Sequence, residues 1–286
     1  MSWIALVRIS KKAFDLARFN AVWRLRVCLT VVSLFLISQA SASSGVSESM
    51  TERLTAESHT IEGVGWLPFR LYTPKLIEGE TVYPLIIFMH GAGERGSDNT
   101  SQLKHGVGSI VHFIERFNKP AFVIAPQVAD GLQWVDTPWS DDAHVLPRSP
   151  STSMSLLLSL IDLVNHKLPI DRSRIYITGI SMGGFGTWDL LMRRPNEFAA
   201  AIPICGGGDE TSAHLIRDIP VWVFHGGDDQ VVKTHRSRNM IQALEGVAGR
   251  PRYTEYPGVG HDSWTVTYDN PKVLHWLFEQ TLPVDP

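Results

Sequence analysis

A serine between glycines has the clearest chemical potential of any residue in this sequence. Ser181 lies in the segment Gly179–Gly184 (GISMGG), after the apolar run Arg174–Thr178 and at the start of a stretch with helical spacing, Met182–Arg193. In a Gly-x-Ser-x-Gly turn between a strand and a helix, the hydroxyl projects above the strand end, and the glycines let strand and helix approach closely. The pattern predicts that Ser181 is a nucleophile. The alternative is a tight turn whose serine has no chemical role.

A nucleophilic serine needs a general base, and His261 occupies the place that fits this role. It lies in Gly258–Asp262 (GVGHD), after the last predicted strand, where glycines allow the loop to carry the imidazole back across the sheet. We interpret His90 and His225, which each precede a glycine at a strand end, as residues that pack loops. The sequence has no histidine pair at metal-ligand spacing with an acid nearby, so we expect neither a metal nor another cofactor.

The carboxylate that orients the base is expected between the serine and the histidine, directly after a strand. Asp228 and Asp229 both follow the apolar run Pro220–Phe224, and Asp209 follows the preceding predicted strand. We favour Asp229, because the chain turns away from the strand end directly after it. Asp228 and Asp209 stay open, and each of the three could instead cap a helix or lie in a solvated loop.

Two backbone N–H groups are needed where negative charge develops on the substrate oxygen. Met182 supplies one, since it follows the nucleophile. The loop His90–Gly96 (HGAGERG) follows another apolar run, and its glycines allow a close approach, so we expect Ala92 to supply the second. A phosphate-binding loop is disfavoured, because no Gly-Lys-Ser/Thr follows these glycines.

Tryptophans near the predicted site indicate an apolar pocket for an acyl or aryl group. Trp134 and Trp139 lie in the long segment 127–150, and Trp264 follows the base by three residues. The alternative is that these rings only pack the loop. The sequence has no long helical lid, which disfavours a lipase.

The elements that must position these residues form an alternating pattern. Continuous apolar runs separated by helical stretches indicate a mostly parallel sheet with helices on both faces, an α/β fold. Ligands bind such sheets beyond the carboxyl ends of the strands, where the predicted site residues gather. The predicted strands are 68–73, 83–89, 121–125, 174–178, 199–204, 220–224 and 252–256, and the predicted helices are 153–166, 182–193, 234–244 and 271–281.

Four segments together resemble the bacterial phospholipase/carboxylesterase-type hydrolases. They are HGAGERGSDN (90–99), YITGISMGGFGTWDL (176–190), VFHGGDDQVV (223–232) and YPGVGHDSW (256–264). The resemblance covers about residues 60–282 and extends to dienelactone hydrolases and to feruloyl and polyhydroxybutyrate esterases. It implies the α/β-hydrolase fold, a triad of Ser181, Asp229 and His261, and oxyanion donors at Ala92 and Met182. Dienelactone hydrolases have cysteine as nucleophile, and this chain has serine there.

The N-terminal 42 residues have the three parts of a secretory signal peptide. Residues 1–26 hold six lysines and arginines against one aspartate, the apolar run Val27–Ile37 follows, and small residues precede a cleavage position after Ala42. The apolar run is about half as long as a membrane span requires. An uncleaved N-terminal anchor is the alternative.

The rest of the chain is expected to form one catalytic domain at residues 57–286, after a flexible Ser/Thr/Glu-rich lead-in at 43–56. Hydrophobic residues make up 44% of the sequence, which is enough for one large core. Loss of residues 1–42 removes six of the 26 basic and one of the 29 acidic residues and leaves a formal net charge near −8. Only Cys205 then remains, so no intrachain disulfide is expected.

These observations predict a secreted or periplasmic serine carboxylesterase that hydrolyses short-chain or aryl esters through an acyl-enzyme. Its expected partner is a small-molecule or polymer-linked ester, with no nucleic acid and no stable membrane association after signal cleavage. One alternative is a serine peptidase of the prolyl-oligopeptidase-like type, although neither a gating domain nor an acidic anchor for a peptide amine is evident. Another is a non-catalytic binding protein on the same fold, although such proteins usually lose a member of the triad.

Overall fold

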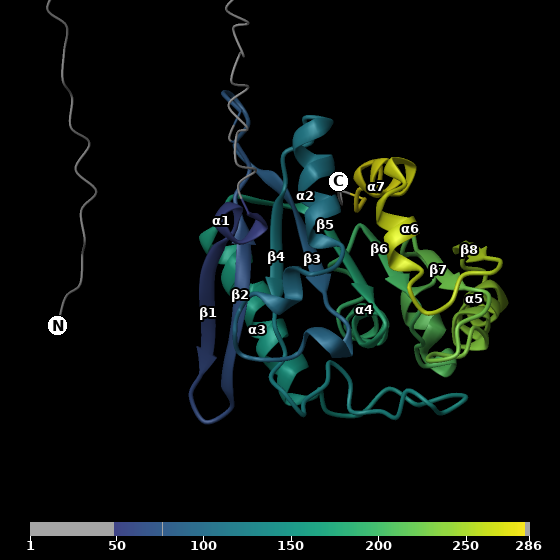
Figure 1. Cartoon of the computed structure of the whole chain (residues 1–286). Coiled ribbons are helices and arrows are strands. Elements are labelled where there is room, and N and C mark those ends of the chain that lie inside the picture. The colour runs from purple at the N-terminus through teal and green to yellow at the C-terminus, as the bar shows by residue number, and fades with distance from the viewer. Residues whose placement is uncertain (1–48, 76, 284–286) are drawn as a thin grey trace, which may run out of the picture. The chain divides into compact units, whose positions relative to one another are not determined.

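The protein is described by a computed structural model at residues 49–75 and 77–283, and one eight-stranded sheet runs through them (Figure 1). The strand order is β1-β2-β4-β3-β5-β6-β7-β8. All neighbours from β4 to β8 are parallel, and β1 and β2 are antiparallel additions at one edge. The strands are β1 (Thr55–Ile61), β2 (Gly65–Tyr72), β3 (Tyr83–Met89), β4 (Phe122–Pro126), β5 (Ile170–Ile180), β6 (Ala200–Ile204), β7 (Trp222–Gly226) and β8 (Arg252–Tyr256).

Helices cover both faces of this sheet, and a separate hydrophobic cluster fills each interface. Helices α3, α4 and α5 pack on one face, and α2 and α7 pack on the other. The α/β-hydrolase fold predicted from the sequence is thereby confirmed. The α-helices are α1 (Met50–Arg53), α2 (Val107–Arg116), α3 (Thr152–Lys167), α4 (Met182–Arg193), α5 (His235–Gly246), α6 (Trp264–Tyr268) and α7 (Pro271–Phe278), and three 3-10 helices are η1 (Ala92–Glu94), η2 (Ser101–Leu103) and η3 (Glu210–Ile216).

The central strands are buried on both sides, which explains their unbroken apolar sequences. Every residue of β3, β4 and β6 is buried. The polar residues of the candidate site follow the carboxyl ends of the strands, at one edge of the sheet. In Figure 1 this is the lower edge, beneath which the teal segment 127–150 passes.

The structure describes only part of the N-terminal segments predicted from the sequence. The predicted signal peptide, residues 1–42, lies outside the described residues, as do residues 43–48 of the predicted lead-in. Within the described part of the lead-in, Ser49 precedes α1 and donates its backbone N–H to Glu52 Oε2 at 2.7 Å, and β1 starts at Thr55. Between residues 49 and 283, position 76 excepted, no helix combines the length and apolar composition that a membrane crossing requires.

Candidate active site

Ser181 occupies the strained turn that its flanking glycines predicted. It joins β5 to α4 with φ 51° and ψ −117°, a backbone conformation that non-glycine residues rarely adopt. The turn is also tightly packed, since a Cβ atom on Gly183 would lie 2.0 Å from the carbonyl oxygen of Met89 at the end of β3. Only glycine allows this approach, and the approach brings the nucleophile turn against the loop that follows β3.

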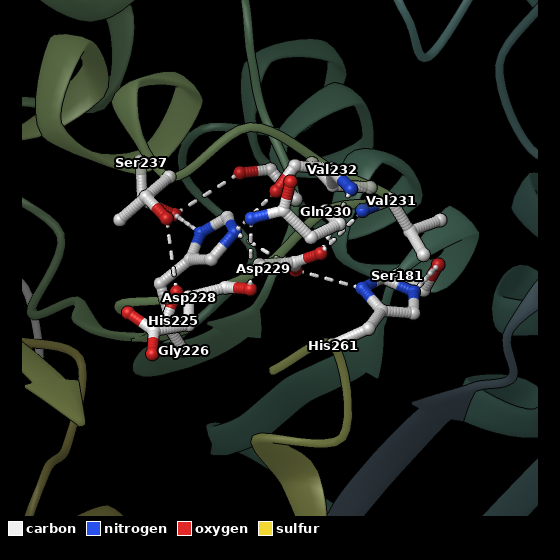
Figure 2. Close-up of polar contacts among 12 residues, drawn as sticks. Ser181, His225, Gly226, Asp228, Asp229, Gln230, Val231, Val232, Ser237 and His261 are labelled. Carbon is white, nitrogen blue, oxygen red and sulfur yellow. Dashed lines mark hydrogen bonds and ion pairs between the residues drawn. The ribbon is translucent and has the colours of Figure 1, made fainter. Parts of the chain in front are cut away.

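Three residues far apart in sequence form a continuous hydrogen-bonded chain at this edge (Figure 2). Nε2 of His261 lies 2.9 Å from Oγ of Ser181, and Nδ1 of His261 lies 2.7 Å from Oδ2 of Asp229. An ionised carboxylate only accepts hydrogen bonds, so Nδ1 carries the proton and Nε2 is free to accept the serine hydroxyl proton. This geometry suits general-base activation of Ser181.

The loop that holds His261 is fixed to the end of β7. Backbone N–H groups of Gly227 and Asp228 donate to the carbonyls of Tyr256 and Val259, each at 2.9 Å. A Cβ atom on Gly226 would lie 2.0 Å from the carbonyl oxygen of Gly260, so a glycine is required at this contact. The contacts place the imidazole beside the loop that holds Asp229.

Of the three candidate carboxylates, the structure places only Asp229 against His261. Asp228 is exposed, and Asp209 instead accepts hydrogen bonds from Leu146 N and from Thr211 at the start of η3. Asp229 is 6% exposed, and its Oδ1 accepts the backbone N–H groups of Val231 at 2.8 Å and Val232 at 3.0 Å.

The charge on Asp229 is stabilised by these donors. Burial by itself raises the pKa of Asp229, but hydrogen bonds from His225, His261 and Val231 outweigh burial and hold that pKa below its ordinary value. Asp229 is therefore ionised at neutral pH and can stabilise an imidazolium on His261. His225 lies 3.2 Å from Oδ2 of Asp229, and the interpretation of His225 as a loop-packing residue missed this contact.

The two expected oxyanion donors lie at the starts of neighbouring helical turns. Met182 is the first residue of α4 and Ala92 the first of η1, and amides at such positions have no partner within their own helix. The loop after β3 approaches the nucleophile turn, because a Cβ atom on Gly91 would lie 3.6 Å from the carbonyl oxygen of Ile180. Arg95 supports this loop by donating from Nε to the carbonyl oxygen of Ala92 at 2.9 Å.

The three tryptophans differ in what they present to the site. Trp134 is fully buried, and its indole N–H donates to the carbonyl oxygen of His90 at 3.0 Å, so in this conformation it has no surface for a substrate. The expectation that Trp134 lines a substrate pocket is therefore wrong, because its ring is part of the hydrophobic core. Trp139 is half-buried with the Arg95 guanidinium 5.9 Å from its ring centre. Trp264 packs edge-on against His261 with ring centres 5.3 Å apart.

A thiol lies close to Asp229 and His261. Sγ of Cys205, at the end of β6, is within 4.8 Å of ligand atoms on both Asp229 and His261, a set that could in principle hold a metal ion. Burial raises the pKa of the Cys205 thiol, so at neutral pH it is a neutral neighbour and not a thiolate ligand. Asp229 and His261 are already hydrogen-bonded to each other, and His261 is also hydrogen-bonded to Ser181.

With this geometry established, comparison with known proteins gives the family. A model of the phospholipase/carboxylesterase family matches residues 77–270, most of the described domain. The chain belongs to the phospholipase/carboxylesterase family. The resemblance inferred from the four sequence segments is thus confirmed.

Relatives of this phospholipase/carboxylesterase-family chain are esterases and depolymerases. It is 25% identical over 160 residues to a bifunctional acetylxylan esterase/xylanase of Neocallimastix patriciarum, and 25% identical over 179 residues to a poly(3-hydroxyalkanoate) depolymerase C of Paucimonas lemoignei. These alignments cover 56% and 62% of this chain but only 21% and 40% of the relatives. The chain thus spans less than half the length of either one.

Solved structures agree with the fold. The crystal structure of a thermostable esterase matches with a TM-score of 0.75 and 40% identity, over 80% of this chain and 64% of that one. A ferulic acid esterase matches with a TM-score of 0.60 at 15% identity, over 79% of this chain and 98% of that one, which shows a shared fold alone.

Proposed function

We propose that this protein is a serine carboxylesterase that hydrolyses short-chain or aryl carboxylic esters through an acyl-enzyme. The observation that carries the proposal is the hydrogen-bonded chain from Ser181 through His261 to Asp229, with Ser181 in a strained turn. Family membership supports it, as do the names of the relatives, which describe an acetylxylan esterase and a poly(3-hydroxyalkanoate) depolymerase.

In the proposed reaction, His261 Nε2 accepts the proton of Ser181 as Oγ attacks the ester carbonyl carbon. The carbonyl oxygen becomes an oxyanion beside the N–H groups of Met182 and Ala92, and Asp229 stabilises the imidazolium. The tetrahedral intermediate then loses the alcohol, which takes the proton from His261, and an acyl-Ser181 remains. Water, deprotonated by the same imidazole, attacks the acyl-enzyme and releases the carboxylic acid.

The aromatic surroundings of the site support the proposed substrate class. Trp264 stands against the base, and Trp139 lies on the segment that passes over the same edge of the sheet. Rings at such positions favour a flat aryl group or a short acyl chain, each methylene contributing about 0.8 kcal/mol until the apolar space is filled. A peptidase is the second enzymatic candidate, because acylaminoacyl peptidases share the fold with a TM-score of 0.60, but at 15% identity this likeness carries no activity.

The test is kcat/KM for 4-nitrophenyl esters from acetate to palmitate, beside methyl ferulate and a proline-containing peptide amide. We expect short-chain and aryl esters to be the best substrates, and Ser181→Ala to lower turnover by about 10⁴-fold or more. A maximum at palmitate would indicate a lipase, and preference for the amide would indicate a peptidase. A fluorophosphonate probe that fails to label Ser181 would indicate a non-catalytic binding protein.

We also propose that the protein is exported to the periplasm or the medium and carries no stable membrane anchor afterwards. The basic region, short apolar run and small residues of positions 1–42 support this proposal. The ester that it meets there is either a small molecule or attached to a polymer.

A further inference from the structure

A second histidine contacts the triad carboxylate from the side opposite His261 (Figure 2). His225 lies near the end of β7 and is fully buried. Its Nε2 is 3.0 Å from the carbonyl oxygen of Val232 and 3.2 Å from Oδ2 of Asp229, and its Nδ1 is 2.7 Å from Oγ of Ser237 on α5. Each ring nitrogen therefore has a polar partner although the ring has no access to water.

These partners fix which nitrogen carries a proton. A carbonyl oxygen and an ionised carboxylate can only accept hydrogen bonds, so Nε2 of His225 must be a donor. The hydroxyl of Ser237 lies 3.1 Å from the carbonyl oxygen of Gly206 and can give its single proton either to that carbonyl or to Nδ1 of His225. The first choice makes His225 an imidazolium and the second leaves it neutral. In both cases Nε2 carries a proton, which is hydrogen-bonded to the carbonyl oxygen of Val232, while Oδ2 of Asp229 lies 3.2 Å from the same nitrogen.

We propose that His225 is a positioning residue for ester hydrolysis, whose Nε2–H group orients Asp229 and draws negative charge from the carboxylate that faces His261. The proposal rests on the proposed esterase function. Asp229 Oδ1 is held by two backbone amides, and Oδ2 is shared between the two histidines. Without His225, only His261 would engage Oδ2, and the carboxylate could rotate away from its line with the base.

The absence of the donor would also change the pH dependence. An imidazole can accept the Ser181 proton only when it is neutral, so the acid side of the kcat/KM profile follows deprotonation of the base. A carboxylate that has lost one donor carries more negative charge and favours the protonated form of His261. The acid limb, which is the rise of kcat/KM with pH on the acidic side of the profile, therefore moves to higher pH when His225 no longer donates to Asp229.

Other ionisable groups surround this histidine and must stay constant in the test. Glu255 on β8 is opposite His225 in the strand register, where hydrogen bonds from Arg238 and Tyr253 hold its pKa at about 2. The thiol of Cys205, the residue after β6, lies near the Asp229 carboxylate and is protonated at neutral pH. Glu255 and Cys205 therefore keep one charge state across the pH range of the acid limb.

Substitution of His225 by glutamine or by asparagine distinguishes the role of Nε2 from that of Nδ1. His225→Gln can place its amide nitrogen where Nε2 lies and keep the donation to Asp229, whereas His225→Asn reaches only the position of Nδ1. We expect the Asn variant to lose about tenfold in kcat and to move the acid limb of kcat/KM upward by about half a pH unit. The Gln variant should remain within about threefold of the parent with the limb unmoved.

Ser237→Ala is the matched control, since it disturbs the same buried network without removing the donor to Asp229. It should lower the melting temperature and leave the acid limb in place. The proposal fails if the acid limb of kcat/KM lies at the same pH in His225→Asn as in the parent, or if Ser237→Ala shifts it by the same amount. In either case His225 is only a packing residue.

A measurement on the unsubstituted protein keeps the test independent of variant folding. The ¹⁵N shifts of His225 should report a neutral Nε2–H tautomer or an imidazolium, and a neutral ring protonated only at Nδ1 would overturn the proposal. Fluorophosphonate labelling and ester turnover by the parent are measured alongside. If the parent shows neither, the esterase function is wrong, whereas an active parent with insensitive His225 variants contradicts the role of His225 alone.

Discussion

At the scale of single residues, the site depends on which of two adjacent aspartates faces inward. Asp228 and Asp229 follow β7 side by side, yet Asp228 is exposed while Asp229 is buried among three hydrogen-bond donors, with Nε2 of His225 a further 3.2 Å from its Oδ2. The contribution of Asp228 to this loop is its backbone N–H, which donates to Val259 at 2.9 Å. A substitution of its side chain leaves that contact in place.

The two aspartates should therefore respond differently to the same substitution. Asp229→Asn keeps the size of the side chain but favours the wrong tautomer of the base, and we expect kcat to fall by about 10⁴-fold. Asp228→Asn should change kcat by less than about threefold, because it alters only an exposed side chain that has no role in the hydrogen-bonded chain. The measurement is kcat on 4-nitrophenyl acetate. Equal losses would reverse the assignment of the acid.

At the scale of elements, a strand, a turn and a helix fit together without space for a side chain. The end of β3, the end of β5 and the start of α4 meet at the glycines around Ser181. The fully buried Arg236 of α5 contacts segment 127–150. It donates hydrogen bonds to the carbonyl oxygen of Asp141 at 2.6 Å and to Nδ1 of His144. Both arrangements position flexible parts of the site on rigid elements.

Addition of one methyl group to this junction should be severe. In Gly183→Ala the new Cβ meets the carbonyl oxygens of Met89 at 2.0 Å and His90 at 2.8 Å, and backbone atoms cannot yield as a flexible side chain would. We expect a loss above about 3 kcal/mol, seen as a fall of at least about 6 °C in the melting temperature, together with loss of ester turnover. Circular dichroism and the turnover assay measure the two effects.

Gly246→Ala is the matched control for that substitution. Gly246 ends α5, and no atom lies within 4 Å of a Cβ placed there. The melting temperature should change by less than about 2 °C, since alanine at a helix end meets no neighbour. A Gly183→Ala protein as stable as this control would mean that the strand–helix contact is looser than the structure indicates.

At the scale of the whole molecule, the fold is held by two hydrophobic clusters on the faces of one sheet. The parallel strands bring residues from positions 92 to 261 to one edge, because the chain returns to the same edge at the end of each strand. Within the described residues the one free cysteine is Cys205, which is fully buried. Covalent crosslinks therefore contribute nothing to this part of the chain.

Export and processing should leave a mature protein that begins near Ser43 and carries one thiol. N-terminal sequencing of exported material locates the cleavage, which we expect after Ala42. Titration with a thiol reagent should find about one equivalent after denaturation and almost none in the native state, since Cys205 is 0% exposed. A product that retains Val27–Ile37 would show that the segment is an anchor, and a second thiol from Cys28 would accompany it.

The sequence by itself determined most of the strands and helices of the sheet and the tight turn at Ser181. Strands 83–89 and 252–256 and helix 182–193 have the bounds that their patterns predicted, because buried apolar runs and helical spacing are local signals. Helix α2 was missed although its apolar residues at positions 107, 110, 111 and 114 have helical spacing. Strand β1 offered no such signal, since it is a polar, mostly exposed edge strand that exists only by pairing with β2.

The tertiary structure alone decided which side chains meet at the site. Local sequence favoured Asp229 over its neighbour. Only the position of His261, on the loop that follows β8, shows which carboxylate the imidazole contacts. His225 resembled a loop-packing residue until the fold placed it 3.2 Å from Asp229, and Trp134 resembled a pocket residue until the fold buried it. The physical reason is that side-chain direction depends on contacts between elements distant in the chain, whereas periodicity records only what each segment does within its own length.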